Sequence, residues 1–187
     1  MNGMDLLFPD ETPSSNAEGS SAPGFAAANK NAWKILVIDD EVEVHKVTEL
    51  VLRNVKFDGS GLNFLHAYSA EQARGLLSDN EDIALALVDV VMETDHAGLD
   101  LVKWIREEIK NKQVRLVLRT GQPGQAPEQQ VIEAYDINDY KDKTELTNTK
   151  LRTLLFAALR SYRDIVTIDK SRLGLERVIR ATASINE

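Results

Sequence analysis

Apolar residues along this chain gather in five short runs, separated by segments in which they recur three or four positions apart. The short runs are rich in β-branched residues and are bounded by polar ones, which predicts strands, whereas the wider spacing predicts helices. Strands that alternate with helices form a parallel sheet covered on both faces. The predicted strands are "WKILVID" (33–39), "LNFLHAY" (62–68), "IALALVDV" (83–90), "VRLVLRT" (114–120) and "INDYK" (137–141).

Local signals mark where several helices begin. The first helix is predicted within 41–54 because its apolar residues recur at helical spacing: Val44, Val47, Val51 and Leu52. Ser69 is a predicted N-cap, and Gln72, three residues later, completes a capping box. A third helix is predicted over 98–109. A fourth is predicted where Pro127, a residue suited to the first helical turn, precedes "EQQVIEAY".

The two ends of the chain differ in composition from the middle. Residues 1–31 are rich in Ser, Ala, Gly, Pro and Asn, which predicts a disordered N-terminal tail ahead of a folded core at 32–146. From 147 to 187 the sequence contains no proline and only Gly174 interrupts it, so we expect a fifth helix that extends beyond the core.

That last helix carries a heptad pattern. Its first part suits packing on the sheet, but Ile165, Ile168, Leu175 and Ile179 need another partner. A parallel two-stranded coiled coil, and hence a homodimer, provides one, although Arg172 is a poor seam residue. The alternative is a helix that packs back on its own domain. The full a/d series is Leu151, Leu154, Ala158, Ser161, Ile165, Ile168, Arg172, Leu175, Ile179 and Thr182.

The composition of the chain excludes several kinds of partner and site. A formal net charge of −8 argues against a nucleic-acid partner, and the absence of cysteine excludes thiol catalysis and cysteine-ligated metals. We expect His45 and His96 on the surface and His66 in a structural position. No apolar run is long enough for a membrane span and no secretory signal is present, so a cytoplasmic protein is expected.

Polar side chains stand where the predicted strands end. Asp39 and Asp40 end the first strand, Asp89 the third and Thr120 the fourth, and Lys143 follows the fifth. In an open doubly wound α/β sheet of the flavodoxin-like order 2-1-3-4-5, ligands bind at the carboxyl ends of the strands. The pattern therefore predicts one site for all five residues, although each of them alone also fits a turn, a cap or a buried pair.

The chemistry of this set is specific. Clustered carboxylates repel one another unless a cation neutralises them, and oxygen ligands without His or Cys favour Mg²⁺. A carboxylate such as Asp89 can attack a phosphoryl group and form an aspartyl-phosphate. The Thr120 hydroxyl and the Lys143 ammonium can then hold the remaining phosphoryl oxygens.

Four segments in this order, "ILVIDDE", "LALVDVVM", "VLRTG" and "NDYKDK", resemble the receiver domain of two-component response regulators over about residues 33–160. The resemblance implies that Asp89 accepts a phosphoryl group from a histidine kinase or a phosphotransfer protein. It also implies a Mg²⁺ site made by Asp39, Asp40, Asp89 and the backbone carbonyl of Val91.

The resemblance further implies that Thr120 and Lys143 sense the phosphoryl group and that Tyr140 is the switch aromatic. "DVVMETDHAGLDLV", "VLRTGQPGQAPE", "YDINDYKDKTEL" and "ALRSYRD" are similar to receivers that precede a domain of unknown function and an HD-GYP-type cyclic di-GMP phosphodiesterase. The implied function is relay through the last helix to an output domain outside this chain, with no enzyme activity of its own. The alternative is a degenerate receiver that serves as a constitutive dimerisation module.

The chain departs from the receiver pattern at two prolines. Glu93 replaces the proline common after the acceptor's methionine, and Thr144 replaces the one common after the lysine. A cis bond before a non-proline residue costs about 3–4 kcal/mol, so we expect the Lys143–Thr144 bond to be trans. Val91 and Gln122 are expected near the attack path. Because an apolar Val91 cannot orient a hydrolytic water, a long-lived phosphoryl state is predicted.

Overall fold

The computed structural model of the chain describes residues 32–121, 136–143 and 147–183. The predictions for the tail at 1–31, for the fourth helix after Pro127, for Gln122 and for the Lys143–Thr144 bond lie outside these residues. Within them, no helix has the combination of length and hydropathy that a membrane span requires.

Five parallel strands form one sheet, as the alternating pattern predicts. The spatial order is β2-β1-β3-β4-β5, which confirms the flavodoxin-like order 2-1-3-4-5. β3, at the centre of the sheet, is buried along its whole length. The strands are β1 (Trp33–Ile38), β2 (Leu62–Ala67), β3 (Ile83–Asp89), β4 (Arg115–Thr120) and β5 (Asp139–Asp142).

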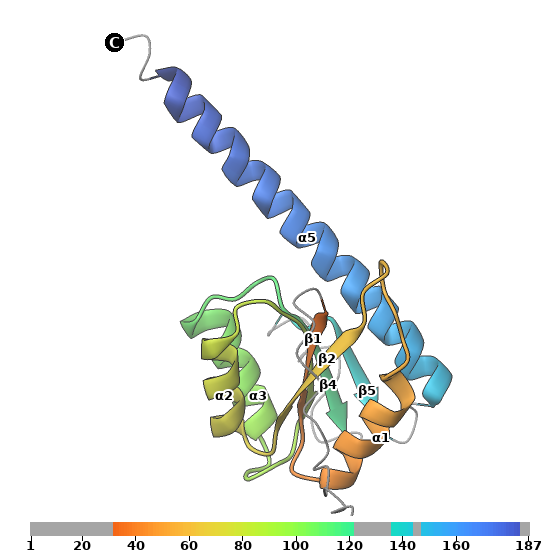
Figure 1. Ribbon diagram of the computed structural model, residues 1–187. Helices are drawn as coiled ribbons and strands as arrows, with labels where there is room; N and C mark the ends of the chain where they lie inside the picture. The colour runs from red at the N-terminus through yellow and green to blue at the C-terminus, as the bar shows by residue number, and fades with distance from the viewer. Residues whose placement is uncertain (1–31, 122–135, 144–146, 184–187) are drawn as a thin grey trace, which may run out of the picture.

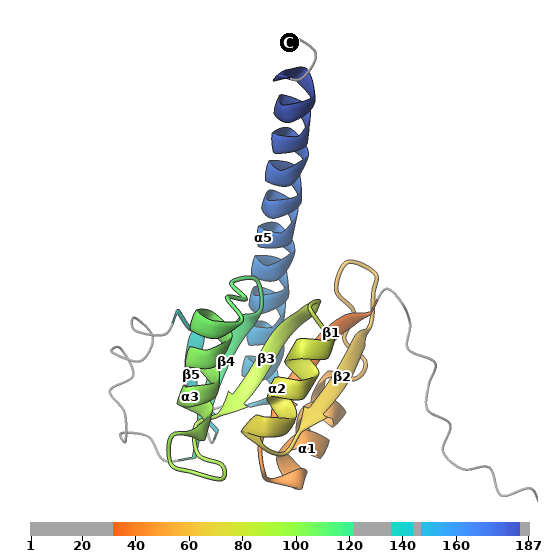
Figure 2. The same cartoon turned by 90° about the vertical axis from the view of Figure 1, so that its left-hand side faces the viewer.

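Helices cover both faces of the sheet, so the described chain has three layers (Figure 1). α2 and α3 lie on one face, and α1 and the first half of α5 lie on the other. Figure 2 shows α5 continuing far past the edge of the sheet. The helices are α1 (Val42–Leu52), α2 (Ala70–Asp79), α3 (Ala97–Lys103), which runs into a π-helical turn η1 (Trp104–Glu108), and α5 (Asn148–Ala183).

Side chains of each strand alternate between two cores. Leu36 and Ile38 pack in the core on the α2/α3 side, whereas Ile35 packs in the core on the α1/α5 side. This alternation follows from the two-residue period of a strand. It also decides to which helix layer each polar residue at a strand end belongs.

The start of α2 has the predicted cap. The Ser69 hydroxyl accepts a hydrogen bond from the Gln72 N–H at 3.2 Å. The Gln72 side chain reaches back and accepts from the Tyr68 N–H at 2.9 Å, one residue before the capping-box partner that the sequence pattern predicts.

The buried stripe of α1 agrees with the prediction at Val51 and differs from it at two other positions. His45 was expected on the surface but is only 2% exposed, while Val47 is 55% exposed. Burial of His45 is tolerated because both ring nitrogens have partners: Nε2 lies 2.7 Å from the Asp39 carbonyl oxygen, and Nδ1 lies 2.9 Å from Nδ1 of His66. His96 is exposed, as expected.

α5 is buried in its first half and exposed afterwards. Leu155 and Leu159 are fully buried against the sheet, and Tyr162 packs edge-on against Trp33. Further along, Gln113 donates a hydrogen bond to Asp169 at 2.8 Å. Beyond Asp169 the described side chains are all exposed, so the helix extends past the core, as predicted.

Candidate functional site

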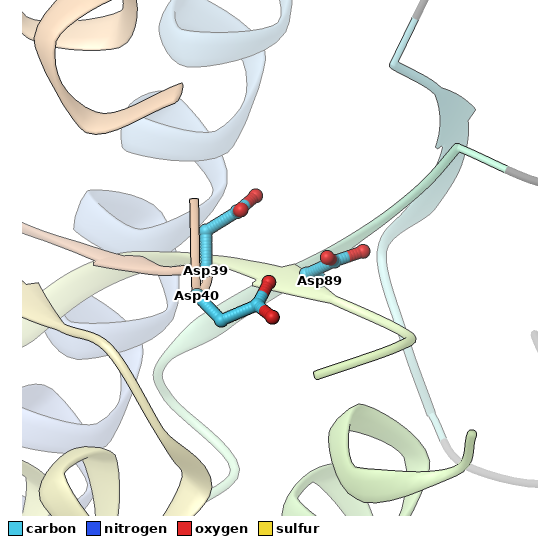
Figure 3. A group of neighbouring side chains, drawn as sticks. All are labelled: Asp39, Asp40 and Asp89. Carbon is cyan, nitrogen blue, oxygen red and sulfur yellow. The ribbon is translucent and has the colours of Figure 1, made fainter. Parts of the chain in front are cut away.

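Three aspartates meet at the carboxyl edge of the sheet. Asp39 and Asp40 follow β1 directly, and Asp89 is the last residue of the neighbouring strand β3 (Figure 3). One carboxylate oxygen from each of the three lies within 4.8 Å of the other two. Asp39 and Asp89 are buried and Asp40 is exposed, so the cluster is open to solvent on one side.

The backbone around Asp89 is packed against the first turn of α3. The Gly98 N–H donates to the Val90 carbonyl oxygen at 3.1 Å. A Cβ on Gly98 would stand 2.8 Å from the carbonyl carbon of Asp89 and 2.9 Å from Cα of Val90. Only glycine allows this approach, which fixes the direction in which the chain leaves β3.

Glu93 anchors the other side of the same loop. Its carboxylate accepts a hydrogen bond from the Ala70 N–H, at the first turn of α2, at 2.8 Å. A carboxylate is favourable at a helix N-terminus because the N–H groups there have no partner within the helix. Glu93, which replaces a proline of the receiver pattern, therefore joins the β3–α3 loop to the start of α2.

Lys143 brings its ammonium into the cluster from the segment after β5. Its Nζ lies 2.9 Å from Oδ2 of Asp89, 3.1 Å from Oδ2 of Asp39 and 3.0 Å from Oε1 of Glu41. Its backbone N–H also donates to the Thr120 carbonyl oxygen at 2.7 Å. The segment after β5 is therefore joined both to the acids and to the end of β4.

The pKa values of both Asp89 and Lys143 are raised by their surroundings. Burial raises the pKa of Asp89, and the charge of Asp39 adds to the rise, while hydrogen bonds from Lys143 and the Val91 backbone oppose it. Burial alone would lower the pKa of Lys143, but its bonds to Asp89 and Glu41 and the charge of Asp39 raise it overall. At neutral pH Lys143 is therefore a firmly held cation.

The remaining predicted site residues lie at the same edge. Thr120 ends β4 and is 2% exposed. Tyr140, on β5, is 6% exposed and packs in the core on the α2/α3 side, so its ring already lies inward. Val91 follows β3, and its backbone forms a hydrogen bond with Asp89.

Sequence reasoning did not single out Glu41 or Arg119. Glu41 joins the cluster through Lys143. Arg119 is 3% exposed, pairs in register with Asp89 and places Nη2 3.4 Å from Oδ2 of Asp39. Its signal was visible in "VRLVLRT", because a charged residue inside an apolar strand calls for a partner just as Asp89 does.

Two proteins of known name are similar to this chain in sequence. A protein from Vibrio cholerae named 3'3'-cGAMP-specific phosphodiesterase 2 is 50% identical over 184 residues, which is 98% of this chain and 34% of that protein. The chain thus spans about a third of that relative. A chemotaxis protein CheY homolog from Campylobacter jejuni is 29% identical over 107 residues, covering 57% of this chain and 78% of that protein.

Two further comparisons concern the last helix and the fold. A family model described as "Domain of unknown function (DUF3369)" matches residues 155–187. The signal receiver domain of an HD domain-containing protein from Pseudomonas fluorescens Pf-5 superposes with a TM-score of 0.63 at 19% identity, covering 76% of this chain and 98% of that one. The chain therefore contains a response-regulator receiver domain of the CheY-like fold.

Proposed function

We propose that this chain is a phospho-accepting receiver in which Asp89 takes a phosphoryl group from a phosphohistidine of a histidine kinase or a phosphotransfer protein. A carboxylate oxygen of Asp89 forms the new O–P bond, the P–N bond breaks, and its electron pair stays on the imidazole. The observation that carries the proposal is the Lys143 ammonium, 2.9 Å from Asp89 inside a cluster of three aspartates.

The donor set suits a hard divalent cation. We propose that Asp39, Asp40 and Asp89 hold Mg²⁺, because their carboxylate oxygens come close enough to share one ion. We include the backbone carbonyl of Val91 as a fourth ligand on the strength of the resemblance to receiver domains. When bound, Mg²⁺ supplies positive charge that attracts phosphoryl oxygens to the site.

The residues of the chain itself position and retain the phosphoryl group. Lys143 pairs with Asp89 in this structure and, after transfer, binds a phosphoryl oxygen in place of the lost carboxylate charge. The Thr120 hydroxyl holds a second oxygen. Because Lys143 and Thr120 are joined through their backbones, a shift at either residue moves the other and changes the space around Tyr140 on β5.

The lifetime of the phosphoryl group follows from Val91. Its apolar side chain offers no hydrogen bond to a water that attacks phosphorus, so hydrolysis lacks a positioned nucleophile. We therefore propose that the phosphorylated state persists long enough to act on a separate domain.

The long helix is the proposed route to the output. We divide the chain into a tail (1–31), a receiver core (32–146) and an extended helix (147–187). α5 packs on β3 and β4, the strands that end in Asp89 and Thr120, and then leaves the core. Since the Vibrio cholerae relative is named as a phosphodiesterase of a cyclic dinucleotide, we propose an output domain that turns over cyclic di-GMP or a related cyclic dinucleotide.

We propose that a second copy of the chain covers the exposed seam of α5. Ile168, Leu175 and Ile179 are 65–67% exposed and fall on the a/d positions of one heptad register. Leu175→Glu is expected to convert a dimer to a monomer in light scattering after size exclusion. Leu173→Glu, an exposed residue off this seam, is the matched control and should leave the dimer intact. A monomeric wild-type chain, with or without phosphorylation, would contradict the pairing.

Intact-protein mass after incubation with acetyl phosphate and Mg²⁺ tests the central proposal. The wild-type chain should gain one phosphoryl group, whereas Asp89→Asn and a chelator-treated sample should gain none. Asp100→Asn, an exposed aspartate outside the cluster, is the control and should behave like wild type. If the wild-type chain gains no phosphoryl group under any condition, the degenerate receiver, a constitutive dimerisation module, is the better account.

A further inference from the structure

Three adjacent strands carry a row of charged residues on one face of the sheet. Arg119 of β4 is the register partner of Asp89 of β3, and Asp39 follows Ile38, whose register partner immediately precedes Asp89. All three lie on the face covered by α1 and α5, where Val117 also packs. The two acids of the row therefore meet a cation that belongs to the sheet itself.

Arg119 reaches Asp39 from the interior. Its Nη2 lies 3.4 Å from Oδ2 of Asp39, and its Nη1 donates to the Thr48 hydroxyl of α1 at 3.2 Å. Its Nε has no acceptor among the described residues. Lys143 contacts the same Asp39 oxygen, but its side chain is 18% exposed against 3% for Arg119. Asp39 thus lies between a cation near solvent and a cation inside the fold.

Burying the Arg119 guanidinium costs free energy, because the charge loses its hydration. Burial lowers the pKa of Arg119, and the charges of Asp39 and Asp89 oppose that change, so the group keeps its charge. An apolar side chain would pack there without the cost of desolvating a charge. The position of the charge beside Asp39 is therefore the property that needs an explanation.

We propose that Arg119 is a resident counter-cation of the aspartate cluster: it compensates Asp39 from inside the fold when no divalent cation is bound, and it weakens the binding of that cation. The role rests on the proposed Mg²⁺ site. Arg119 is a positioning residue, since it acts through Asp39 and is shielded from the solvent side on which a phosphoryl group arrives.

The expected size follows from Coulomb's law. A cation among the clustered oxygens lies about 8 Å or less from the guanidinium, given the separations of 3.4 Å and 4.8 Å. The metal ion carries a charge of +2 and the guanidinium a charge of +1. With an effective dielectric constant of about 60, between that of water (about 80) and that of a protein surface (about 20), their repulsion corresponds to about a tenfold change in affinity for Mg²⁺. Removal of the positive charge should therefore tighten Mg²⁺ binding about tenfold.

The experiment compares three variants with wild type by isothermal titration of Mg²⁺. Arg119→Met removes the charge and is expected to bind Mg²⁺ about tenfold more tightly. Arg119→Lys keeps the charge and should restore the wild-type dissociation constant. Thr48→Val removes the other hydrogen-bond partner of Arg119 without changing any charge, so it should leave the dissociation constant within about twofold.

Thermal unfolding with and without Mg²⁺ gives a second readout. The melting temperature of Arg119→Met should fall in chelator and recover more with Mg²⁺ than that of wild type. A variant that folds only when Mg²⁺ is present supports the proposal. If Arg119→Met fails to fold in both conditions, Arg119→Gln, which keeps polar atoms but not the charge, is measured in its place.

Two outcomes would overturn the proposal and can be told apart. If wild type binds Mg²⁺ and becomes phosphorylated while the neutral variants bind Mg²⁺ no more tightly, Arg119 has no counter-cation role and the proposed receiver function stands. If neither wild type nor the neutral variants bind Mg²⁺, the metal site of the proposed function is wrong as well.

Discussion

Gly98 and Gly75 are both helical glycines, and the same substitution should have opposite effects at the two positions. Gly98 lies in the first turn of α3, where an added Cβ would overlap the carbonyl oxygen of Asp89 and lie 2.8–2.9 Å from the Asp89 carbonyl carbon and Cα of Val90. Gly75 lies on the exposed side of α2 and has no atom within 4 Å of an added Cβ. Comparing Gly98→Ala with Gly75→Ala therefore isolates the contact between α3 and the end of β3.

The expected magnitudes follow from what each methyl group meets. At Gly98 the obstacle is backbone, which cannot rotate away as a side chain does, so β3 or α3 must shift. Overpacking of this kind costs about 3 kcal/mol, or about 6–12 °C in melting temperature for a chain of this size. At Gly75, alanine removes the entropic penalty of a helical glycine and should stabilise the fold by about 0.5–1 kcal/mol.

Urea unfolding monitored by circular dichroism measures both effects in one series. Both variants should keep the wild-type dependence on urea concentration, so that the midpoints report stability alone. The reasoning would be refuted if Gly98→Ala unfolded within about 0.5 kcal/mol of wild type, because the close approach of α3 to Asp89 would then be absent in solution.

Three further outcomes are expected, each measured by urea unfolding in chelator. Lys143→Met leaves Asp39 and Asp89 without their shared ammonium and should cost about 2 kcal/mol or more; an unchanged midpoint would contradict the ion-pair geometry. Burial raises the pKa of Asp89, so the folded state binds its proton more tightly than the unfolded chain. The contribution of Asp89 to stability should therefore fall as pH rises from 3.8 through the raised pKa, so Asp89→Asn should gain stability relative to wild type over that range; a constant difference between the two would argue against this. Ser69→Ala removes the α2 cap and should cost about 1 kcal/mol; an unchanged midpoint would show that the cap is frayed in solution.

Most of the fold was predictable because a parallel sheet buries its strands on both faces. The apolar runs stand out in the sequence, and their bounds agree with the strands to within about two residues. The order of the strands followed from the doubly wound pattern rather than from any single residue. The long last helix was predictable because its sequence has no proline and a single glycine, Gly174, through which the helix continues.

The stripe of α1 shows where periodicity was insufficient. Val51 is buried as the apolar spacing predicts, but Val47 is exposed, and His45 and Thr48 also turn inward. Their polar atoms are satisfied by the Asp39 carbonyl, His66 and Arg119, and these partners come from distant parts of the chain. A hydropathy pattern along one helix contains no information about such partners.

The same limit applies to the acidic cluster. Its aspartates could be inferred because each ends a strand, and parallel strands end at a common edge. Arg119 sits one residue before a strand end, so the rule passed over it. Its relation to Asp39 appears only when the register of three strands is known.

α5 is one continuous helix, so a tilt of its packed first half would move its exposed far end as well. At 1.5 Å per residue, its 36 residues span about 54 Å, and the 14 residues after Asp169 project about 21 Å from the last contact with the core. A tilt of about 10° at that contact would displace the far end by about 4 Å, which is about two thirds of the helical pitch of about 5.4 Å. Under the proposed function, a small rearrangement at the carboxyl edge of the sheet that tilts α5 would displace any domain packed on its far end.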